Sequence, residues 1–267
     1  MQEPSQSHRR IWWCPTGPLA FLPIHAAGIY EEGGICVSDF AISSYIPKIE
    51  TLIEKSKKKE AAPRILLVSQ AKAPGLPQIL GADKETKMLL ELVQGCGLEV
   101  LRLSGDDATV KRMEEEMPSY RWIHLACHAT QEVLRPMKSA FHLLDGDLDL
   151  SEIIKLQIPN ADFAFLSACQ TSTGDSENSD EAVHLAGGML VAGYRSVIST
   201  MWSIKDEYGS EVAESFYSFL LKKGNDDKIQ WDGAAHAIHH ATQYLRKKLG
   251  DTDESLLTWV PYVHFGI

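Results

Sequence analysis

Two short apolar stretches, RWIHLAC at residues 121–127 and DFAFLSA at residues 162–168, decide the fold expected for this chain. Both are mainly apolar and of strand length, which is typical of strands covered on both faces of a sheet. RILLVSQ at 64–70 and SVISTMW at 196–202 have the same character. Segments of helical periodicity, such as residues 82–95, lie between such runs. This alternation predicts an α/β fold with a mainly parallel sheet and helices on both faces.

The remaining elements follow from turn signals and periodicity. Asp145-Gly146 is a hairpin turn signal inside AFHLLDGDLDL, at residues 140–150. We expect residues 1–10 to be a flexible tail and residues 11–267 to be one domain, with 11–60 as its N-terminal subregion. Further strands are expected at 36–45, 98–103 and 259–265, and helices at 47–57, at 107–117 with Asp106 or Asp107 as its cap, from Ser151, and at 180–194, 206–222 and 232–249.

The composition excludes several classes of protein. The 267 residues are 44% hydrophobic, enough to bury a core, and the net charge of −10 disfavours a nucleic-acid or anionic-membrane partner. The first ten residues lack the apolar core of a signal peptide, and no apolar run reaches about 18 residues, so a cytoplasmic protein is expected. Five cysteines without CxxC spacing argue against a disulfide framework and a zinc site, and no glycine-rich phosphate loop suggests a cofactor.

A histidine and a cysteine follow two of the predicted strands. His128 comes directly after 121–127, and Cys169 comes directly after 162–168. Because ligands bind at the carboxyl ends of parallel strands, we expect the imidazole and the thiol to face each other. A thiol attacks a carbonyl as thiolate, and a nearby histidine takes its proton and later returns one to the leaving amine. The backbone N–H groups of Ala129 and Cys169 are candidates for the oxyanion hole that this chemistry needs.

The motifs around both residues resemble those of a known family. IHLACHA (123–129) and LSACQT (166–171), whose histidine and cysteine lie 41 residues apart, are similar to the CHAT domain, a branch of the caspase–separase group of cysteine peptidases. The motifs resemble those of CHAT domains in fungal proteins, which often follow helical repeats. This chain contains no such repeats. The similarity extends to LPIHAAGIY (22–30), SDFAISSYIP (38–47), SAFHLLDGDLDL (139–150), EAVHLAGGMLVAGYRSVISTMWSIKD (181–206) and WVPYVHFGI (259–267).

The resemblance implies a caspase-like three-layer α/β/α sandwich and a cysteine endopeptidase. His128 is then the general base or acid and Cys169 the nucleophile. Many relatives have glycine after the catalytic histidine, where Ala129 stands here. Asp206 matches an acidic position that would hold a basic substrate residue before the cut bond, although it also suits a helix N-cap. The implied partners are a protein or peptide substrate and a regulatory or helical-repeat protein.

Two other functions remain open. The domain is either a catalytically silent interaction or scaffold module within a larger signalling system, or an acyl transferase or amidase that uses the same dyad. His124 and Cys127 are expected to be structural, because a metal-binding HxxxH pair needs a helix and Cys127 points to the opposite face from His128. The polar loop 171–180 is either a solvated connector or a mobile loop beside the nucleophile.

Overall fold

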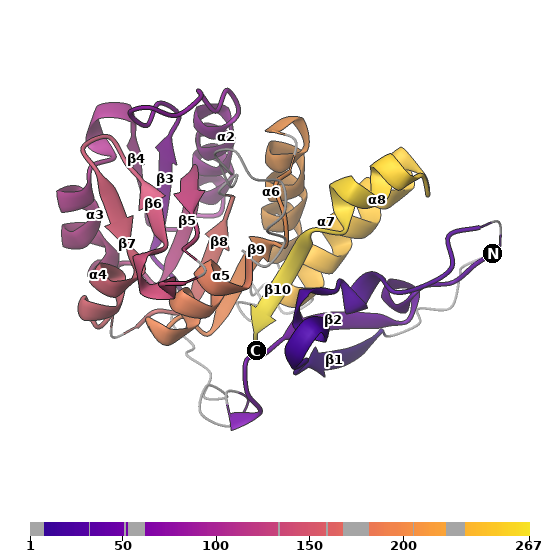
Figure 1. The fold of residues 1–267 in the computed structure, drawn as a ribbon. Helices are drawn as coiled ribbons and strands as arrows, with labels where there is room; N and C mark the ends of the chain where they lie inside the picture. The colour runs from indigo at the N-terminus through magenta and orange to yellow at the C-terminus, as the bar shows by residue number, and fades with distance from the viewer. Residues whose placement is uncertain are drawn as a thin grey trace.

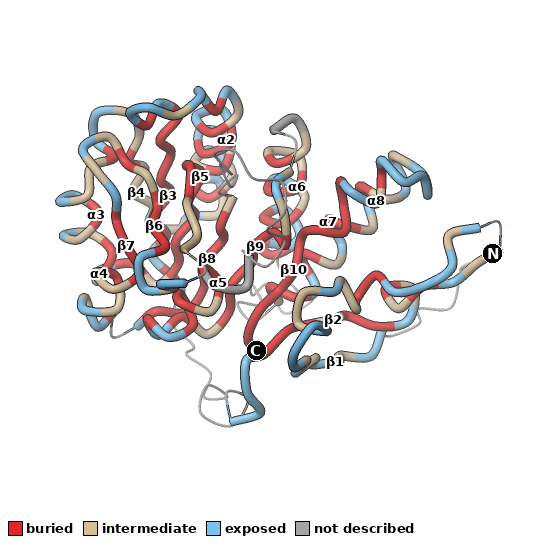
Figure 2. The backbone as a smooth tube through the Cα atoms, in the orientation of Figure 1, coloured by how far each residue is buried: buried red, intermediate tan, exposed pale blue. Residues whose placement is uncertain are grey.

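One connected sheet with helices on both faces forms the described part of the protein (Figure 1). The structure is a computed structural model, and it describes residues 8–31, 33–50, 52, 62–132, 134–158, 160–167, 182–204, 206–222 and 233–267. The expected three-layer α/β/α arrangement is confirmed. The central strands of the sheet are buried, whereas the edge strand Arg9–Trp13 is partly exposed, as Figure 2 shows. No helix in these ranges is long and apolar enough to cross a bilayer.

The sheet is mainly parallel, as the sequence predicts. Its strands lie in the order β1-β2-β10-β9-β8-β5-β3-β4, and within that path only β9 and β10 run antiparallel. A hairpin of β6 and β7 is attached to the end of β5. The strands are β1 Arg9–Trp13, β2 Ala41–Tyr45, β3 Ile65–Gln70, β4 Val100–Ser104, β5 Trp122–Thr130, β6 Ala140–His142, β7 Asp147–Asp149, β8 Phe163–Leu166, β9 Ser196–Thr200 and β10 Tyr262–Gly266.

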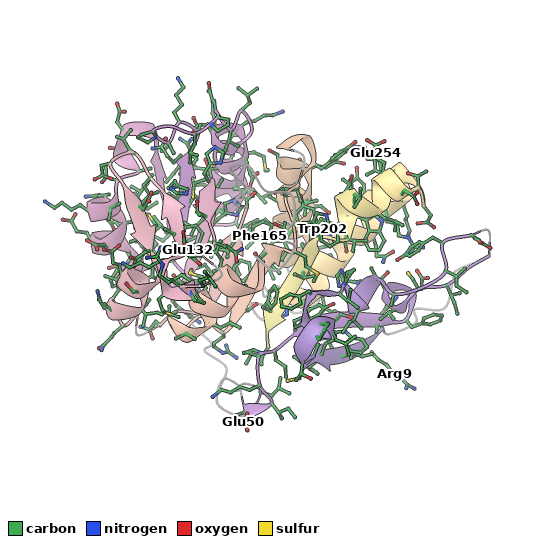
Figure 3. The ribbon with its side chains drawn as sticks, viewed as in Figure 1. Arg9, Glu50, Glu132, Phe165, Trp202 and Glu254 are labelled. Atoms are coloured by element: carbon green, nitrogen blue, oxygen red, sulfur yellow. The ribbon has the colours of Figure 1, made fainter. Side chains whose placement is uncertain are left out.

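Two apolar clusters fill the space between the sheet and its helices. α2, α6 and α7 cover the face that carries Trp122 and Phe165, and α3, α4 and α5 cover the face that carries Ile123 and Leu166. Phe165 lies in the middle of the molecule, whereas Arg9 and Glu50 extend from its edge (Figure 3). The helices are α2 Ala82–Gly95, α3 Val110–Glu116, α4 Leu150–Lys155, α5 Ala182–Val191, α6 Asp206–Leu220, α7 Ala234–Leu249 and α8 Asp253–Trp259.

Several predicted boundaries are wrong for local reasons. Arg9 and Arg10, assigned to the tail, pair in parallel with β2 and so belong to the sheet. The helix cap predicted at Asp106 or Asp107 is Thr109, whose hydroxyl accepts from the Arg112 N–H. The two aspartates lie instead in a 3₁₀ turn, Gly105–Asp107.

The C-terminal segment also differs from the prediction. Residues 259–265 were expected to form one strand, but Trp259 ends helix α8 and β10 begins at Tyr262. Thr252 caps the start of α8 reciprocally with Ser255, and the turn that holds Pro261 separates the end of the helix from β10. The helix predicted over 47–57 falls mostly outside the described residues.

Candidate active site

The strands that carry the predicted dyad are neighbours in the sheet. β5 and β8 pair in parallel, with Leu125 opposite Leu166, so their carboxyl ends meet at one edge. His128 is three residues beyond Leu125, and Cys169 is three residues beyond Leu166 in the sequence. Ser167 is the last described residue after β8. Cys169 and the loop 171–180 lie outside the described residues.

His128 is held in one orientation by a backbone carbonyl. The side chain is almost fully buried, with 4% of the residue exposed, and Nε2 lies 2.6 Å from the carbonyl oxygen of Pro77. A carbonyl oxygen can only accept, so Nε2 carries the proton and Nδ1 of the neutral ring keeps its lone pair. Nδ1 is buried and has no hydrogen-bond partner among the described residues. The ring therefore offers an unused proton acceptor at this edge of the sheet.

His128 lies inside β5 rather than after it. The strand was expected to end at Cys127, but it continues to Thr130 because β6 pairs with its last three residues. The Asp145-Gly146 turn returns the chain, as predicted, with the Leu143 N–H donating to the Gly146 carbonyl. The hairpin thereby orders the backbone from His128 to Thr130, while β3 pairs with Cys127, the residue before His128.

The N–H of Ala129 points toward β8, the strand that leads to Cys169. In a β-strand, the N–H and C=O groups of successive residues point to alternate edges. Trp122 donates to Arg64 beside β3, while the carbonyl of Arg121 accepts from Phe163 of β8. The even-numbered residues of β5 thus bond on the β3 side, and Ala129, an odd-numbered residue, faces β8.

The register of the β6–β7 hairpin gives the same direction for the Ala129 N–H. The Leu143 N–H donates to Gly146 and the Leu150 N–H to Ser139, so odd-numbered residues of β6 bond to β7 and even-numbered ones to β5. His142 and Ala140 therefore bond to His128 and Thr130. Ala129 faces Phe141 in a pair without hydrogen bonds, and its N–H is not used by β6. Figure 1 draws β6 on the β3 side of β5 and β8 on the other.

Alanine is compatible with the backbone at position 129. Among the described residues, only Gln157 is a non-glycine residue with positive φ, so Ala129 does not need glycine's conformational freedom. Its side chain is fully buried in the apolar cluster beneath α3, α4 and α5. The departure from glycine therefore leaves the N–H in place.

His124 and Cys127 lie in the core, in agreement with the prediction that they are structural. His124 is fully buried, stacks on Phe165, and places Nε2 2.7 Å from Oε1 of Glu85. Burial raises the pKa of the Cys127 thiol to about 12, which keeps it protonated and unreactive. Among the described residues, no group of three or more His, Cys, Asp or Glu side chains is arranged to hold a metal ion.

A small hollow opens beside the ends of β5 and β8. Its volume is about 10 Å³, and its lining includes Glu85, Ala126, Ser167 and Gly209. Glu85 is 4% exposed, and only its Oε1 has a described partner, in His124. Asp206, the candidate for holding a basic substrate residue, is the first helical residue of α6, one position beyond the N-cap that was its alternative role. The side chain of Asp206 is outside the described part of the chain.

One group of the site could not have been found from the sequence. The carbonyl of Pro77 lies 51 residues before His128 and plays the orienting part that a carboxylate plays in a Ser-His-Asp triad. Every residue has a carbonyl, so no residue type marks this position. Only the path of the loop between β3 and α2 brings it to the imidazole.

Comparisons with known proteins agree with the fold. The family model described as CHAT domain matches residues 1–267. The crystal structure of the Arg specific cysteine proteinase gingipain R superposes with a TM-score of 0.59 at 11% identity, covering 84% of this chain and 53% of that one. The complex of Porphyromonas gingivalis RgpB pro- and mature domains gives 0.53 at 12% identity, covering 84% and 54%.

A third similar structure is the Saccharomyces cerevisiae separase–securin complex. The TM-score is 0.55 at 11% identity, covering 86% of this chain and 14% of that one. This chain thus spans about half of the gingipain chains and a small part of the separase complex chain. At such identities the likeness shows a shared caspase-like fold. No curated protein matches the sequence.

Proposed function

The chain belongs to the CHAT domain family, and we propose that it is a cysteine endopeptidase with Cys169 as nucleophile and His128 as general base. The observation that carries the proposal is the state of His128. Its Nε2 donates a hydrogen bond to the Pro77 carbonyl, and its Nδ1 is buried with no hydrogen-bond partner among the described residues. His128 lies on β5, which pairs with β8, the strand that leads to Cys169.

The mechanism follows from these positions. His128 Nδ1 takes the proton of the Cys169 thiol, and the thiolate attacks the substrate carbonyl carbon. The negative oxygen accepts hydrogen bonds from the N–H groups of Ala129 and Cys169. The imidazolium, stabilised by the Pro77 carbonyl, then protonates the leaving amine as the C–N bond breaks. Water attacks the resulting thioester with His128 again as base, which releases the acid and restores the thiol.

We propose that the site prefers substrates with a basic residue immediately before the cleaved bond, and that Asp206 binds this residue. Asp206 begins α6, and the hollow beside the ends of β5 and β8 is lined by Gly209 of the same helix. A carboxylate holds a guanidinium through paired charge-assisted hydrogen bonds. The Arg specificity stated for gingipain R, which shares this fold, supports the assignment.

A peptide-library digestion tests the proposed activity. The purified protein should cleave the library, and Cys169→Ala and His128→Ala should each abolish cleavage, because neither the thiolate nor its base can be replaced. Cys14→Ala is the matched control, since Cys14 is an exposed free thiol. Cleavage that survives in Cys169→Ala would refute the nucleophile, and an inert wild type would favour the scaffold function.

The same library tests the specificity. Asp206→Asn should lower the cleavage rate after Arg by about 30-fold or more, since losing one partner of a desolvated charge pair costs about 2 kcal/mol or more. Glu214→Gln, an exposed position on the same helix, is the control. An unchanged Arg preference in Asp206→Asn would rule out this role.

A further inference from the structure

A hydroxyl, an imidazole and a carboxylate form a chain across the three strands next to His128. Thr130 Oγ1 of β5 lies 2.5 Å from Nε2 of His142 in β6, and Nδ1 of His142 lies 2.6 Å from Oδ1 of Asp147 in β7. The imidazole side chain is 15% exposed and the carboxylate 63%. The carboxylate accepts from Nδ1–H, so the Thr130 hydroxyl donates to Nε2 of the neutral ring.

This chain of hydrogen bonds lies on the same face as the His128 side chain. His142 is directly opposite His128 in the antiparallel ladder, and Asp147 is directly opposite His142. Residues directly opposite each other point to one face, and Thr130 shares that face with His128 because a single residue, Ala129, lies between them. The three side chains therefore adjoin the candidate base without being needed for its contact with Pro77.

The two faces of the hairpin are held in different ways. Ala129, Phe141 and Leu148 are at most 1% exposed and fix the inner face by apolar packing. On the opposite face, which also carries the buried His128 and Ala140, the Thr130–His142–Asp147 chain of hydrogen bonds joins all three strands. Ala129 packs on one face and its neighbour Thr130 bonds on the other, so both sets of contacts restrain the Ala129 N–H, which points toward β8.

We propose that Thr130, His142 and Asp147 are positioning residues that hold the end of β5 so that the Ala129 N–H stays aimed at the reacting carbonyl. The inference rests on the proposed peptidase function. The hydrogen bonds stop the hairpin from twisting away from β5, and a misplaced donor in an oxyanion hole slows chemistry more than binding. In this role the three side chains act through the Ala129 backbone rather than on the substrate.

Replacing the hydroxyl alone is the sharpest test. Thr130→Val keeps the β-branched shape and removes only the hydrogen bond to His142, and Thr130→Ser keeps the hydroxyl as the matched control. We expect Thr130→Val to lower kcat about 10-fold with KM unchanged, and Thr130→Ser to remain near wild type. His142→Ala should act in the same direction as Thr130→Val, while Asp147→Asn, which still accepts from Nδ1–H, should retain most of the rate.

Hydrogen exchange of the segment 128–131 separates this inference from the proposed activity. Thr130→Val should exchange faster than wild type and Thr130→Ser at the wild-type rate, whether or not the protein cleaves any substrate. Unchanged exchange and unchanged kcat in Thr130→Val would overturn the positioning role. If the wild type is inert but Thr130→Val exchanges faster as expected, the hydrogen bonds of Thr130, His142 and Asp147 do hold the end of β5. The peptidase function is then the part that fails.

Discussion

His25 shows what full burial does to a histidine that the fold keeps neutral. Nε2–H donates to the Val260 carbonyl and Nδ1 accepts from the Tyr45 hydroxyl, both at 2.8 Å. Burial lowers the pKa of His25 to about 4, and the bond to the Val260 carbonyl offsets only part of this. The sequence alone assigned no chemistry to His25. The structure places it where the N-terminal subregion meets the turn before β10.

Acidification should therefore destabilise the protein through His25. Its folded-state pKa lies below that of the unfolded chain, so the unfolded state binds the proton more readily. The contribution of neutral His25 to the free energy of unfolding is fully present above about pH 6.5 and is lost as the pH drops toward 4. Between pH 7 and pH 5 this one group should cost about 2 kcal/mol. Urea unfolding at both pH values should show a smaller loss in His25→Gln, and an equal loss in both proteins would contradict the assignment.

At the candidate site, single residues were easier to predict than their partners. His128 and Cys169 could be nominated because imidazole and thiol have distinctive chemistry and follow apolar runs. The direction of the Ala129 N–H follows from strand parity, which needs the register of β5 against β3, β6 and β8. The chain through His142 needs the same register, although the hairpin signal at Asp145-Gly146 was visible in the sequence.

Elements with strong periodicity were predicted closely. α2 begins at Ala82 and ends at Gly95, as its apolar spacing and flanking glycines indicate. β5 was predicted too short, since its last residues depend on a hairpin partner rather than on their own propensity. α8 was missed because Trp259 belongs to an apolar run that resembles a strand, while its cap residue Thr252 lies in a polar segment.

Helix α5 packs closely against α4 at Gly188. A Cβ on Gly188 would lie 2.3 Å from Cδ1 of Leu150, whereas a Cβ on Gly187 would meet nothing within 4 Å. Gly188→Ala should destabilise the protein by about 1 to 3 kcal/mol through overpacking. Gly187→Ala should stabilise it by up to about 1 kcal/mol through helix propensity. Thermal unfolding compares the two, and equal effects would contradict the close approach of the helices.

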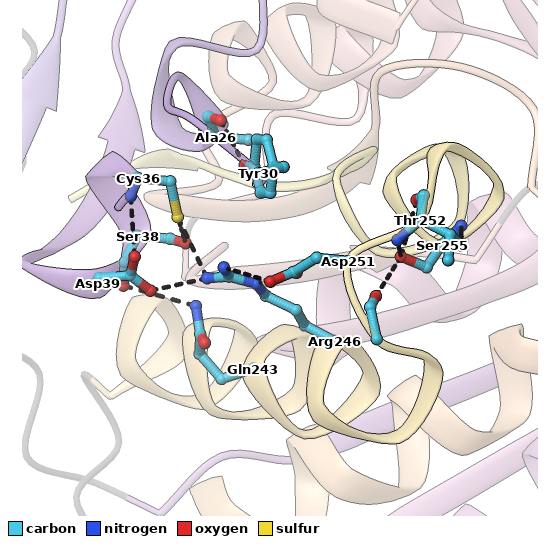
Figure 4. Close-up of polar contacts among 11 residues, drawn as sticks. Ala26, Tyr30, Cys36, Ser38, Asp39, Gln243, Arg246, Asp251, Thr252 and Ser255 are labelled. Atoms are coloured by element: carbon cyan, nitrogen blue, oxygen red, sulfur yellow. Dashed lines mark hydrogen bonds and ion pairs between the residues drawn. The ribbon is translucent and has the colours of Figure 1, made fainter. Parts of the chain in front are cut away.

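At the scale of the whole molecule, Arg246 joins the N-terminal subregion to the C-terminal helices (Figure 4). Its Nη1 lies 2.7 Å from Asp39 Oδ1 and 3.1 Å from Cys36 Sγ, while Nε lies 2.7 Å from Asp251 Oδ1. These bonds raise the pKa of the guanidinium, with the Asp251 bond as the main cause. The N-terminal segment is thus fixed to α7 as well as to the sheet through β2.

Removing the guanidinium should loosen this junction. Arg246→Met should lower the free energy of unfolding by about 2 kcal/mol, because two carboxylates lose their partner. Arg246→Lys should recover only part of the loss, since an ammonium cannot bond both carboxylates with the same fork. Lys247→Ala, at an exposed neighbouring position, should change stability by less than about 0.5 kcal/mol. Full recovery in Arg246→Lys would show that charge alone matters.

Covalent capture of the nucleophile shows which cysteine reacts and whether His128 activates it. The protein is incubated with an acyloxymethyl ketone that carries arginine, digested, and searched by mass spectrometry for the modified cysteine. The adduct should lie on Cys169 in wild type and be absent in Cys169→Ala and His128→Ala. An adduct on Cys14, Cys36, Cys96 or Cys127 instead would rule out Cys169 as the nucleophile. One that forms equally fast in His128→Ala would rule out His128 as its base.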